Sequence, residues 1–273
     1  MPSFNLAGRK VFYEVDGAGQ PLVILNGIMM STLSWTPFVG ELSRHFKLIR
    51  VDFFDQGQSE KLVGMHYDQQ LQIELVHALI RHLQLDVVDM VGISYGGEVA
   101  LLFAATYPKE VHRLMIFNST AYTSKWLKDI GRGWIASGKT RDGAHYYQTT
   151  IPVIYSPEFY ETYHEWMQKR EAVLIPIFSS PEFLDRMERL VLSAESYDIR
   201  GICDQITHPV LLVSAEEDAL TPVHDQEDLS KRLPQATWIK IPRSGHASMY
   251  EQPVLFAVLV TGFFRLGTMT YPI

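Results

Sequence analysis

Cysteine and long apolar stretches are scarce in this sequence, and each shortage excludes a class of protein. Cys203 is the single cysteine among 273 residues, so the chain has no internal disulfide and no site built from several thiolates. No uninterrupted apolar stretch approaches the roughly 20 residues that a membrane-spanning helix requires. Residues 1–6 lack a charged segment followed by an apolar one, so no secretory signal is expected. These absences predict a cytoplasmic protein without a membrane span.

An excess of positive charge is also missing. The 24 lysines and arginines are outnumbered by 31 aspartates and glutamates, which gives a formal net charge of −7. Such a surface has no electrostatic attraction for nucleic acids or anionic membranes, and neither is an expected partner. The histidines lack the paired spacing of helical metal ligands, and no glycine-rich phosphate loop precedes a helix. We therefore expect no metal and no cofactor, while the oligomeric state stays open.

The sequence does contain a regular alternation of strand-like and helical segments. Short apolar runs, each stopped by a polar or glycine-containing loop, predict strands at 21–25, 46–51, 87–91, 114–117, 210–214 and 237–241. Residues 10–15 alternate in polarity and predict the first arm of an antiparallel hairpin. Helical spacing of apolar residues predicts helices over 70–83, 97–107 and 253–264. This pattern indicates an α/β fold, with a mostly parallel sheet flanked by helices on both faces.

One segment interrupts this alternation. Residues 121–206 carry no clear strand signal, and we predict a helical cap inserted into a core formed by 1–120 and 207–273. Aromatic residues number 13 in the 80 positions from 121 to 200, against 19 in the other 193. This enrichment fits a cap whose inner face meets a pocket. It fits equally well a small helical insert that needs large side chains for its own core.

The most informative stretch places a serine between glycines, in the order Gly92-Ile93-Ser94-Tyr95-Gly96. An apolar strand precedes it and an alanine- and leucine-rich helix follows, the context in which this motif forms a tight strand-to-helix turn. The side chain at the apex projects above the sheet, and the helix N-terminus beneath it favours developing negative charge. An ordinary tight turn needs no hydroxyl at its apex. We therefore predict that Ser94 is a nucleophile.

A serine nucleophile needs a base within hydrogen-bond reach and a third group that orients the base. Among ten histidines, His246 follows the predicted strand 237–241, in a loop where Gly245 permits a close approach. Loops after parallel strands lie at the carboxyl edge of the sheet, where Ser94 also emerges. His224 is a weaker alternative.

The third group should be a carboxylate at the same edge of the sheet. Asp218 is favoured because Ala219 and Pro222 suit a turn that directs its side chain inward. Glu216 and Glu217 are the alternatives, although both are more typical of solvated surface charges. The chain order of serine, aspartate and histidine is the order expected of this architecture.

Taken together, these motifs resemble the α/β-hydrolase fold superfamily over nearly the whole chain. The serine turn, the loop 52–59 and the pair Gly245-His246 carry the resemblance, while Asn26 stands where the family usually has histidine. The resemblance implies a serine-nucleophile, esterase-like enzyme with a helical cap. Its oxyanion hole would use the backbone N–H groups of Ile28 and Tyr95.

The expected partner is a small-molecule acyl substrate in a mainly apolar pocket. A carboxylic ester is the default, while thioester cleavage, carbon–carbon bond hydrolysis and acyl transfer would use the same residues. A ligand-binding signalling protein on a hydrolase fold is the alternative from another class. The side chains expected to line the pocket are Met29, Trp35, Tyr122, Trp126 and Tyr155.

Overall fold

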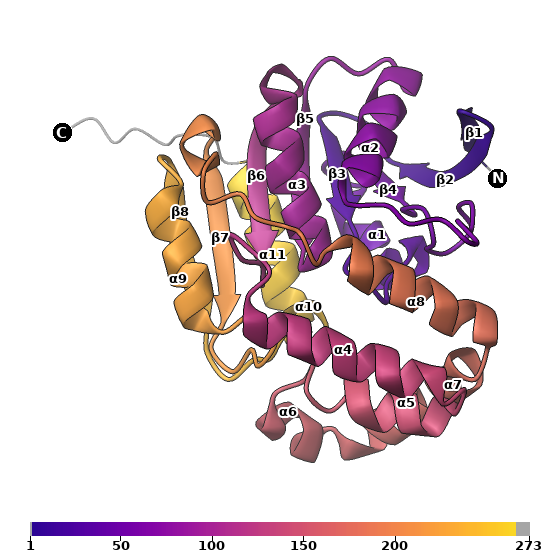
Figure 1. Ribbon diagram of the computed structural model, residues 1–273. Coiled ribbons are helices and arrows are strands. Elements are labelled where there is room, and N and C mark those ends of the chain that lie inside the picture. Colours follow the sequence, from indigo (N-terminus) through magenta and orange to yellow (C-terminus); the bar gives the residue numbers. More distant parts are fainter. Residues whose placement is uncertain (1, 266–273) are drawn as a thin grey trace.

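The computed structural model describes residues 2–265, which form an eight-stranded sheet with helices around it (Figure 1). The strands lie in the order β1-β2-β4-β3-β5-β6-β7-β8. Strands β3 to β8 run parallel, whereas β2 pairs antiparallel with both β1 and β4. The strands are β1 (Ser3–Leu6), β2 (Arg9–Asp16), β3 (Pro21–Leu25), β4 (Lys47–Val51), β5 (Val88–Ile93), β6 (Val111–Phe117), β7 (Val210–Ala215) and β8 (Ala236–Ile241).

The mostly parallel α/β sheet predicted from the sequence is confirmed, and residues 10–15 do belong to an antiparallel hairpin, but the prediction that they form its first arm is wrong. Residues 10–15 lie in β2, which forms the second arm of a hairpin with β1 and pairs on its other side with β4. Tyr13 of β2 is opposite Val51 of β4 in that pairing, and β3 pairs with the other edge of β4. β3 pairs with β4 and β5, and its apolar run fits this interior position, because helices cover both faces of the sheet there.

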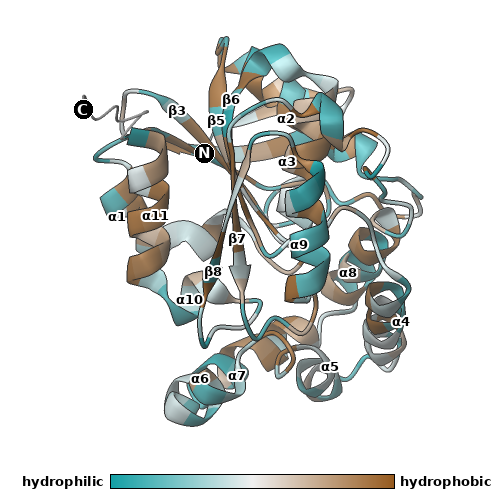
Figure 2. Ribbon diagram, turned by 90° about the vertical axis from the view of Figure 1, so that its left-hand side faces the viewer, coloured by the Kyte–Doolittle hydropathy of each residue, from teal (hydrophilic) through white to brown (hydrophobic). Residues whose placement is uncertain are grey.

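Helices cover both faces of the sheet (Figure 2). On one face, α1 and α11 bury Phe38, Phe256 and Val260 against β3, β5 and β6. On the other face, α2 and α3 bury Leu75, Val76 and Val99. The helices outside the segment between β6 and β7 are α1 (Thr36–Leu42), α2 (Gln70–His82), α3 (Tyr95–Thr106), α9 (Val223–Arg232), α10 (Ser248–Glu251) and α11 (Pro253–Arg265). Short 3-10 turns occur at Thr32–Trp35, Pro108–Glu110 and Cys203–Gln205.

Five helices form the segment between β6 and β7, which we call the helical insertion. They are α4 (Lys125–Lys139), α5 (Gly143–Thr150), α6 (Pro157–Thr162), α7 (His164–Phe178) and α8 (Pro181–Ser193). Ser124, Ser156 and Ser180 cap α4, α6 and α8 by accepting a backbone N–H of the first turn, which satisfies a donor that the helix leaves unpaired. The insertion lies beyond the carboxyl ends of β5 and β6, beneath the sheet in Figure 1.

The aromatic residues of the insertion divide between two roles. Tyr146, Phe178 and Phe183 pack against one another with ring centroids 5.1 to 6.4 Å apart and form a core within the insertion. Tyr155 and Trp134 line the cavity described below. Both explanations of the aromatic enrichment therefore apply to part of it.

Candidate active site

Ser94 occupies the turn between β5 and α3 and has an unusual backbone conformation. Its φ is 54° and its ψ is −122°, a region that L-residues with a Cβ rarely adopt. The Ser94 N–H donates to the carbonyl oxygen of Phe117 over 2.9 Å, which ties the turn to the end of β6. The neighbouring glycines are required, because a Cβ on Gly92 would overlap the backbone of Gly96 and a Cβ on Gly96 would overlap Leu25. The turn thus directs the Ser94 side chain away from the sheet.

Asp218 and His246 lie in the loops that follow β7 and β8. His246 Nδ1 and Asp218 Oδ2 are 2.8 Å apart, and both residues are buried. Asp218 Oδ1 accepts the backbone N–H groups of Leu220 and Thr221 at 2.9 Å each, while the Thr221 hydroxyl donates to Oδ2 over 2.7 Å. These donors fix the carboxylate so that one oxygen faces the imidazole.

The alternative acids and base lie elsewhere. Glu216 and Glu217 are exposed, in keeping with the expectation that they are surface charges. The side chain of His224 is 77% exposed and lies beside Asp225. The structure therefore pairs the favoured histidine with the favoured aspartate.

Ser94 and His246 line the same cavity, which has a volume of about 160 Å³ and lies between the sheet edge and the helical insertion. Within residues 2–265 no direct hydrogen bond joins the Ser94 hydroxyl to the His246 ring. Catalytic hydrogen bonds are often long before substrate binds and shorten in the complex. The cavity thus places the serine beside the histidine–aspartate pair in an arrangement that a bound substrate can tighten.

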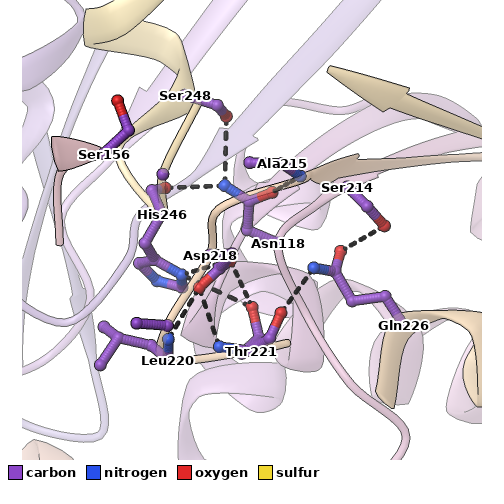
Figure 3. A network of polar contacts seen from close by, with 12 residues as sticks. Asn118, Ser156, Ser214, Ala215, Asp218, Leu220, Thr221, Gln226, His246 and Ser248 are labelled. Carbon is purple, nitrogen blue, oxygen red and sulfur yellow. Dashed lines mark hydrogen bonds and ion pairs between the residues drawn. The ribbon is translucent and has the colours of Figure 1, made fainter. Parts of the chain in front are cut away.

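Asn118, at the end of β6, links the two loops that carry this pair (Figure 3). Its Nδ2 donates to the carbonyl oxygen of His246 over 2.7 Å and to Ser248 Oγ over 3.1 Å. Its Oδ1 accepts the N–H of Ala215, the last residue of β7. Sequence reasoning did not foresee this role of Asn118, because these long-range contacts leave no local pattern.

The helical insertion is fastened to the histidine loop through a buried carboxylate. Glu251 accepts hydrogen bonds from the N–H of Gly245 and from the N–H and hydroxyl of Ser156. Burial raises the pKa of Glu251, against the effect of these donors. Gly245 is required there, because a Cβ would overlap the backbone of Ser156 and Tyr155. The position of the insertion and the position of His246 are therefore set together.

The loop after β3, which contains Ile28, is held by side-chain amides. Gln56 Nε2 donates to the carbonyl oxygens of Gly27 and Ile28 at 2.8 and 3.1 Å. Asn26 Nδ2 donates to Gln56 Oε1, and Trp35 Nε1 donates to Asn26 Oδ1. In a trans peptide the C=O and N–H groups point in opposite directions. Because Gln56 binds the Gly27 carbonyl, the N–H of Ile28 points away from Gln56.

Of the five expected pocket residues, the structure places two in the cavity. Met29 and Tyr155 line it together with Ile28 and Tyr95. The prediction for Trp35 is wrong, because this side chain is fully buried on the face of the sheet that α1 and α11 cover, where it stacks on Phe256. Tyr122 and Trp126 also need correcting, since they line a separate surface hollow and Trp126 is 60% exposed. These side chains were predicted to line the pocket because they are aromatic, and aromatic character does not determine the direction in which a side chain points.

Among the charged side chains that line the cavity, Glu98 and Arg170 were not foreseen. Glu98, in the first turn of α3, is only 4% exposed and accepts a hydrogen bond from Gln69. Burial raises the pKa of Glu98 to about 8, although the Gln69 hydrogen bond opposes the shift. The sequence did carry a signal for Glu98, because a single glutamate stands in the otherwise apolar helix α3. Arg170 of α7 enters from the insertion and left no such signal.

Residues 2–265 contain no helix with the length and apolar character needed to cross a lipid bilayer. The same part of the chain has no group of three or more His, Cys, Asp or Glu side chains arranged to hold a metal ion.

Comparisons with known proteins support the fold. The family model described as alpha/beta hydrolase fold matches residues 20–253. MGS-M2, an alpha/beta hydrolase enzyme from a Medee basin deep-sea metagenome library, is 47% identical over all of both chains, with a TM-score of 0.97. The 2-hydroxy-6-oxo-2,4-heptadienoate hydrolase of Pseudomonas putida is 24% identical and covers 90% of each chain. A pimeloyl-acyl-carrier-protein methyl ester esterase of Nitrosomonas europaea is 26% identical over 90% of this chain and 96% of its own.

Proposed function

This chain belongs to the α/β-hydrolase family, and we propose that within it the chain hydrolyses small carboxylic esters through a covalent acyl-serine intermediate. The observation that carries the proposal is the 2.8 Å contact between His246 Nδ1 and Asp218 Oδ2, beside the cavity that Ser94 lines. We further propose that residues 121–206 act as a cap over a core formed by 1–120 and 207–273. The buried cysteine, Cys203, fits the reducing cytoplasm that we propose as the location.

The first half of the reaction transfers the acyl group to the enzyme. Ser94 Oγ attacks the carbonyl carbon, and its proton passes to His246 Nε2, since Nδ1 already faces Asp218. When the tetrahedral intermediate collapses, His246 gives this proton to the departing alcohol oxygen. The bond from Ser94 Oγ to the acyl carbon thus forms during the attack, and the bond to the alcohol oxygen breaks when the intermediate collapses.

The second half returns the enzyme to its starting state. Water enters the place of the alcohol and loses a proton to His246 as its oxygen attacks the acyl carbon. The bond to Ser94 Oγ then breaks, and His246 protonates the serine. The products are a carboxylic acid and an alcohol.

The negative oxygen formed in each half needs donors that are already in place. The N–H of Ile28 is suited to this role, because Gln56 fixes the peptide that carries it. The N–H of Tyr95 lies in the first turn of α3, where backbone donors have no partner within the helix. Removing one such donor typically costs about 3–4 kcal/mol of transition-state stabilisation.

The cavity lining favours an apolar acyl group. Aliphatic and aromatic side chains such as Met29, Ile151 and Leu174 make up most of its wall. Its size favours a short chain. Thioesters, cleavable ketones and acyl transfer to acceptors other than water would use the same residues, so they are compared directly in the test.

The test combines a fluorophosphonate probe with a panel of p-nitrophenyl esters, a thioester and a β-diketone. We expect labelling of Ser94, turnover of short esters, and loss of both in Ser94→Ala. If the thioester or the ketone were turned over faster than the esters, the proposed ester hydrolysis would be wrong and the faster reaction would take its place. Labelling without any turnover would contradict the proposal and favour a ligand-binding signalling protein.

A further inference from the structure

Arg170 is a cation in the cavity without a carboxylate partner. It lies on α7 and lines the same cavity as Ser94 and His246. Its Nε is buried and has no hydrogen-bond acceptor. Among the described residues, no Asp or Glu oxygen lies within the 4.0 Å of an ion pair. A buried guanidinium donor without an acceptor is costly, so such a group in a ligand cavity indicates a partner that arrives with the ligand.

Aromatic rings hold this guanidinium in place. Its Cζ lies 4.8 Å from the ring centre of Tyr250, 5.3 Å from Trp166 and 6.0 Å from Tyr155. Contact with ring faces favours the positive charge but leaves the in-plane N–H groups without acceptors. The rings therefore position Arg170 without satisfying it.

The other charged groups on the cavity wall do not neutralise Arg170. Lys128 and Glu195 also line the neighbouring surface hollow, which places them at the border of the cavity. Glu98 lies on the core side, and its pKa of about 8 keeps it largely protonated at neutral pH. Glu251 lies outside the cavity lining, and its carboxylate accepts hydrogen bonds from Gly245 and Ser156. The cavity thus offers one positioned positive charge within a mostly apolar wall.

We propose that Arg170 binds a carboxylate carried by the substrate, so that the preferred ester is an anion with an apolar spacer. A planar carboxylate can accept two parallel N–H donors of the guanidinium, a geometry that a lysine at this position would not reproduce. The inference rests on the proposed ester hydrolysis and narrows its substrate class. Arg170 is then a specificity-determining residue and takes no part in bond making.

Two matched substrate pairs test the proposal on the acyl and the alcohol side. The first is p-nitrophenyl hexanoate against mono-p-nitrophenyl adipate, where a carboxylate replaces the terminal methyl group. The second is phenyl butyrate against 4-carboxyphenyl butyrate. We expect a preference of about tenfold or more in kcat/KM for the anionic member of one pair, expressed mainly in KM.

Substitution at position 170 should remove this preference. The readout is the ratio of kcat/KM for the anionic and the neutral ester within each protein: Arg170→Gln should bring the ratio to about one, and Arg170→Lys should restore part of the preference. Lys169→Gln is the matched control, because Lys169 is exposed on the same helix and loses the same charge. The preference should also shrink as ionic strength rises in the unmodified protein, a readout that does not depend on the variants folding.

The outcomes separate the two proposals. Equal or better turnover of both neutral esters by the unmodified protein overturns the role of Arg170, and so does an anionic preference that survives in Arg170→Gln. Absence of turnover for all four esters, with no fluorophosphonate labelling, overturns the hydrolase proposal itself.

Discussion

The side-chain amide of Asn118 donates a 2.7 Å hydrogen bond to the backbone carbonyl oxygen of His246. The adjacent carbonyl of Phe117 accepts the N–H of Ser94, and Asn118 Oδ1 accepts the N–H at the end of β7, the strand that leads to Asp218. Phe117, the last residue of β6, and Asn118, which follows it, thus connect all three loops of the candidate active site. The relative positions of those loops depend on this connection.

Asn118→Asp should weaken activity more than its similar shape suggests. A carboxylate keeps the acceptor for Ala215 but presents an oxygen, in place of a donor, to the His246 carbonyl. We expect kcat to fall by about 10- to 100-fold and stability to fall by about 1–3 kcal/mol. Steady-state kinetics and urea unfolding measure the two effects. Ser119→Ala is the neighbouring control, and an equal loss there would refute a specific role for Asn118.

Ser94→Gly and Ser94→Ala should both be inactive but should differ in stability. The φ of 54° strains any residue with a Cβ, and glycine relieves the strain. We expect the glycine variant to be about 1 kcal/mol more stable than the alanine variant, despite the greater flexibility of its unfolded chain. Thermal unfolding of the two proteins decides this. Equal stabilities of the two variants would contradict the prediction and would mean that the backbone at position 94 is not strained.

Asp218→Asn should reduce kcat by about 10⁴-fold while the protein stays folded, because the amide no longer holds the imidazole in the required tautomer. Thr221→Val should have a smaller effect of about tenfold, since it removes one donor to Asp218 Oδ2. Glu217→Gln, on the exposed neighbour, should leave kcat unchanged. If Glu217→Gln were as damaging as Asp218→Asn, the assignment of the acid would have to be revised.

Gln56→Glu should disturb the candidate oxyanion loop. The substitution replaces the donor to the Gly27 and Ile28 carbonyls with an oxygen that repels them. We expect a loss of about 3 kcal/mol in transition-state stabilisation, seen in kcat with little change in KM. Gln58→Glu at an exposed site nearby serves as the control. A change confined to KM would show that the loop binds substrate without stabilising the oxyanion.

Glu98 should make the protein less stable as pH rises. Its folded pKa of about 8 lies above its ordinary value of 4.5, so the folded state holds a proton that the unfolded state releases. The stabilisation is fully present below pH 4.5, declines by about 1 kcal/mol per pH unit above it, and is gone above pH 8. Glu98→Gln should flatten this part of the profile, as measured by urea unfolding at several pH values. Parallel profiles for the two proteins would exclude a buried neutral Glu98.

The sequence predicted those parts of the fold and site that depend on local pattern. The strands and the turn at Ser94 follow from apolar runs and glycine spacing, and the loop positions of Asp218 and His246 follow from the parallel sheet. Asn118, Gln56 and Arg170 were not foreseen in their roles, because each acts through residues that only the folded chain brings near. Trp35 and Trp126 were misplaced for a related reason, since aromatic content does not reveal whether a side chain faces the core, the cavity or solvent.

The most direct test of the central claim is mass spectrometry of protein quenched during turnover of a short p-nitrophenyl ester, followed by peptide mapping. The account predicts one acyl group per chain, attached to Ser94, which appears with the first burst of p-nitrophenol and is absent from Ser94→Ala. Turnover that persists in Ser94→Ala, or an acyl group attached to another residue, would contradict it.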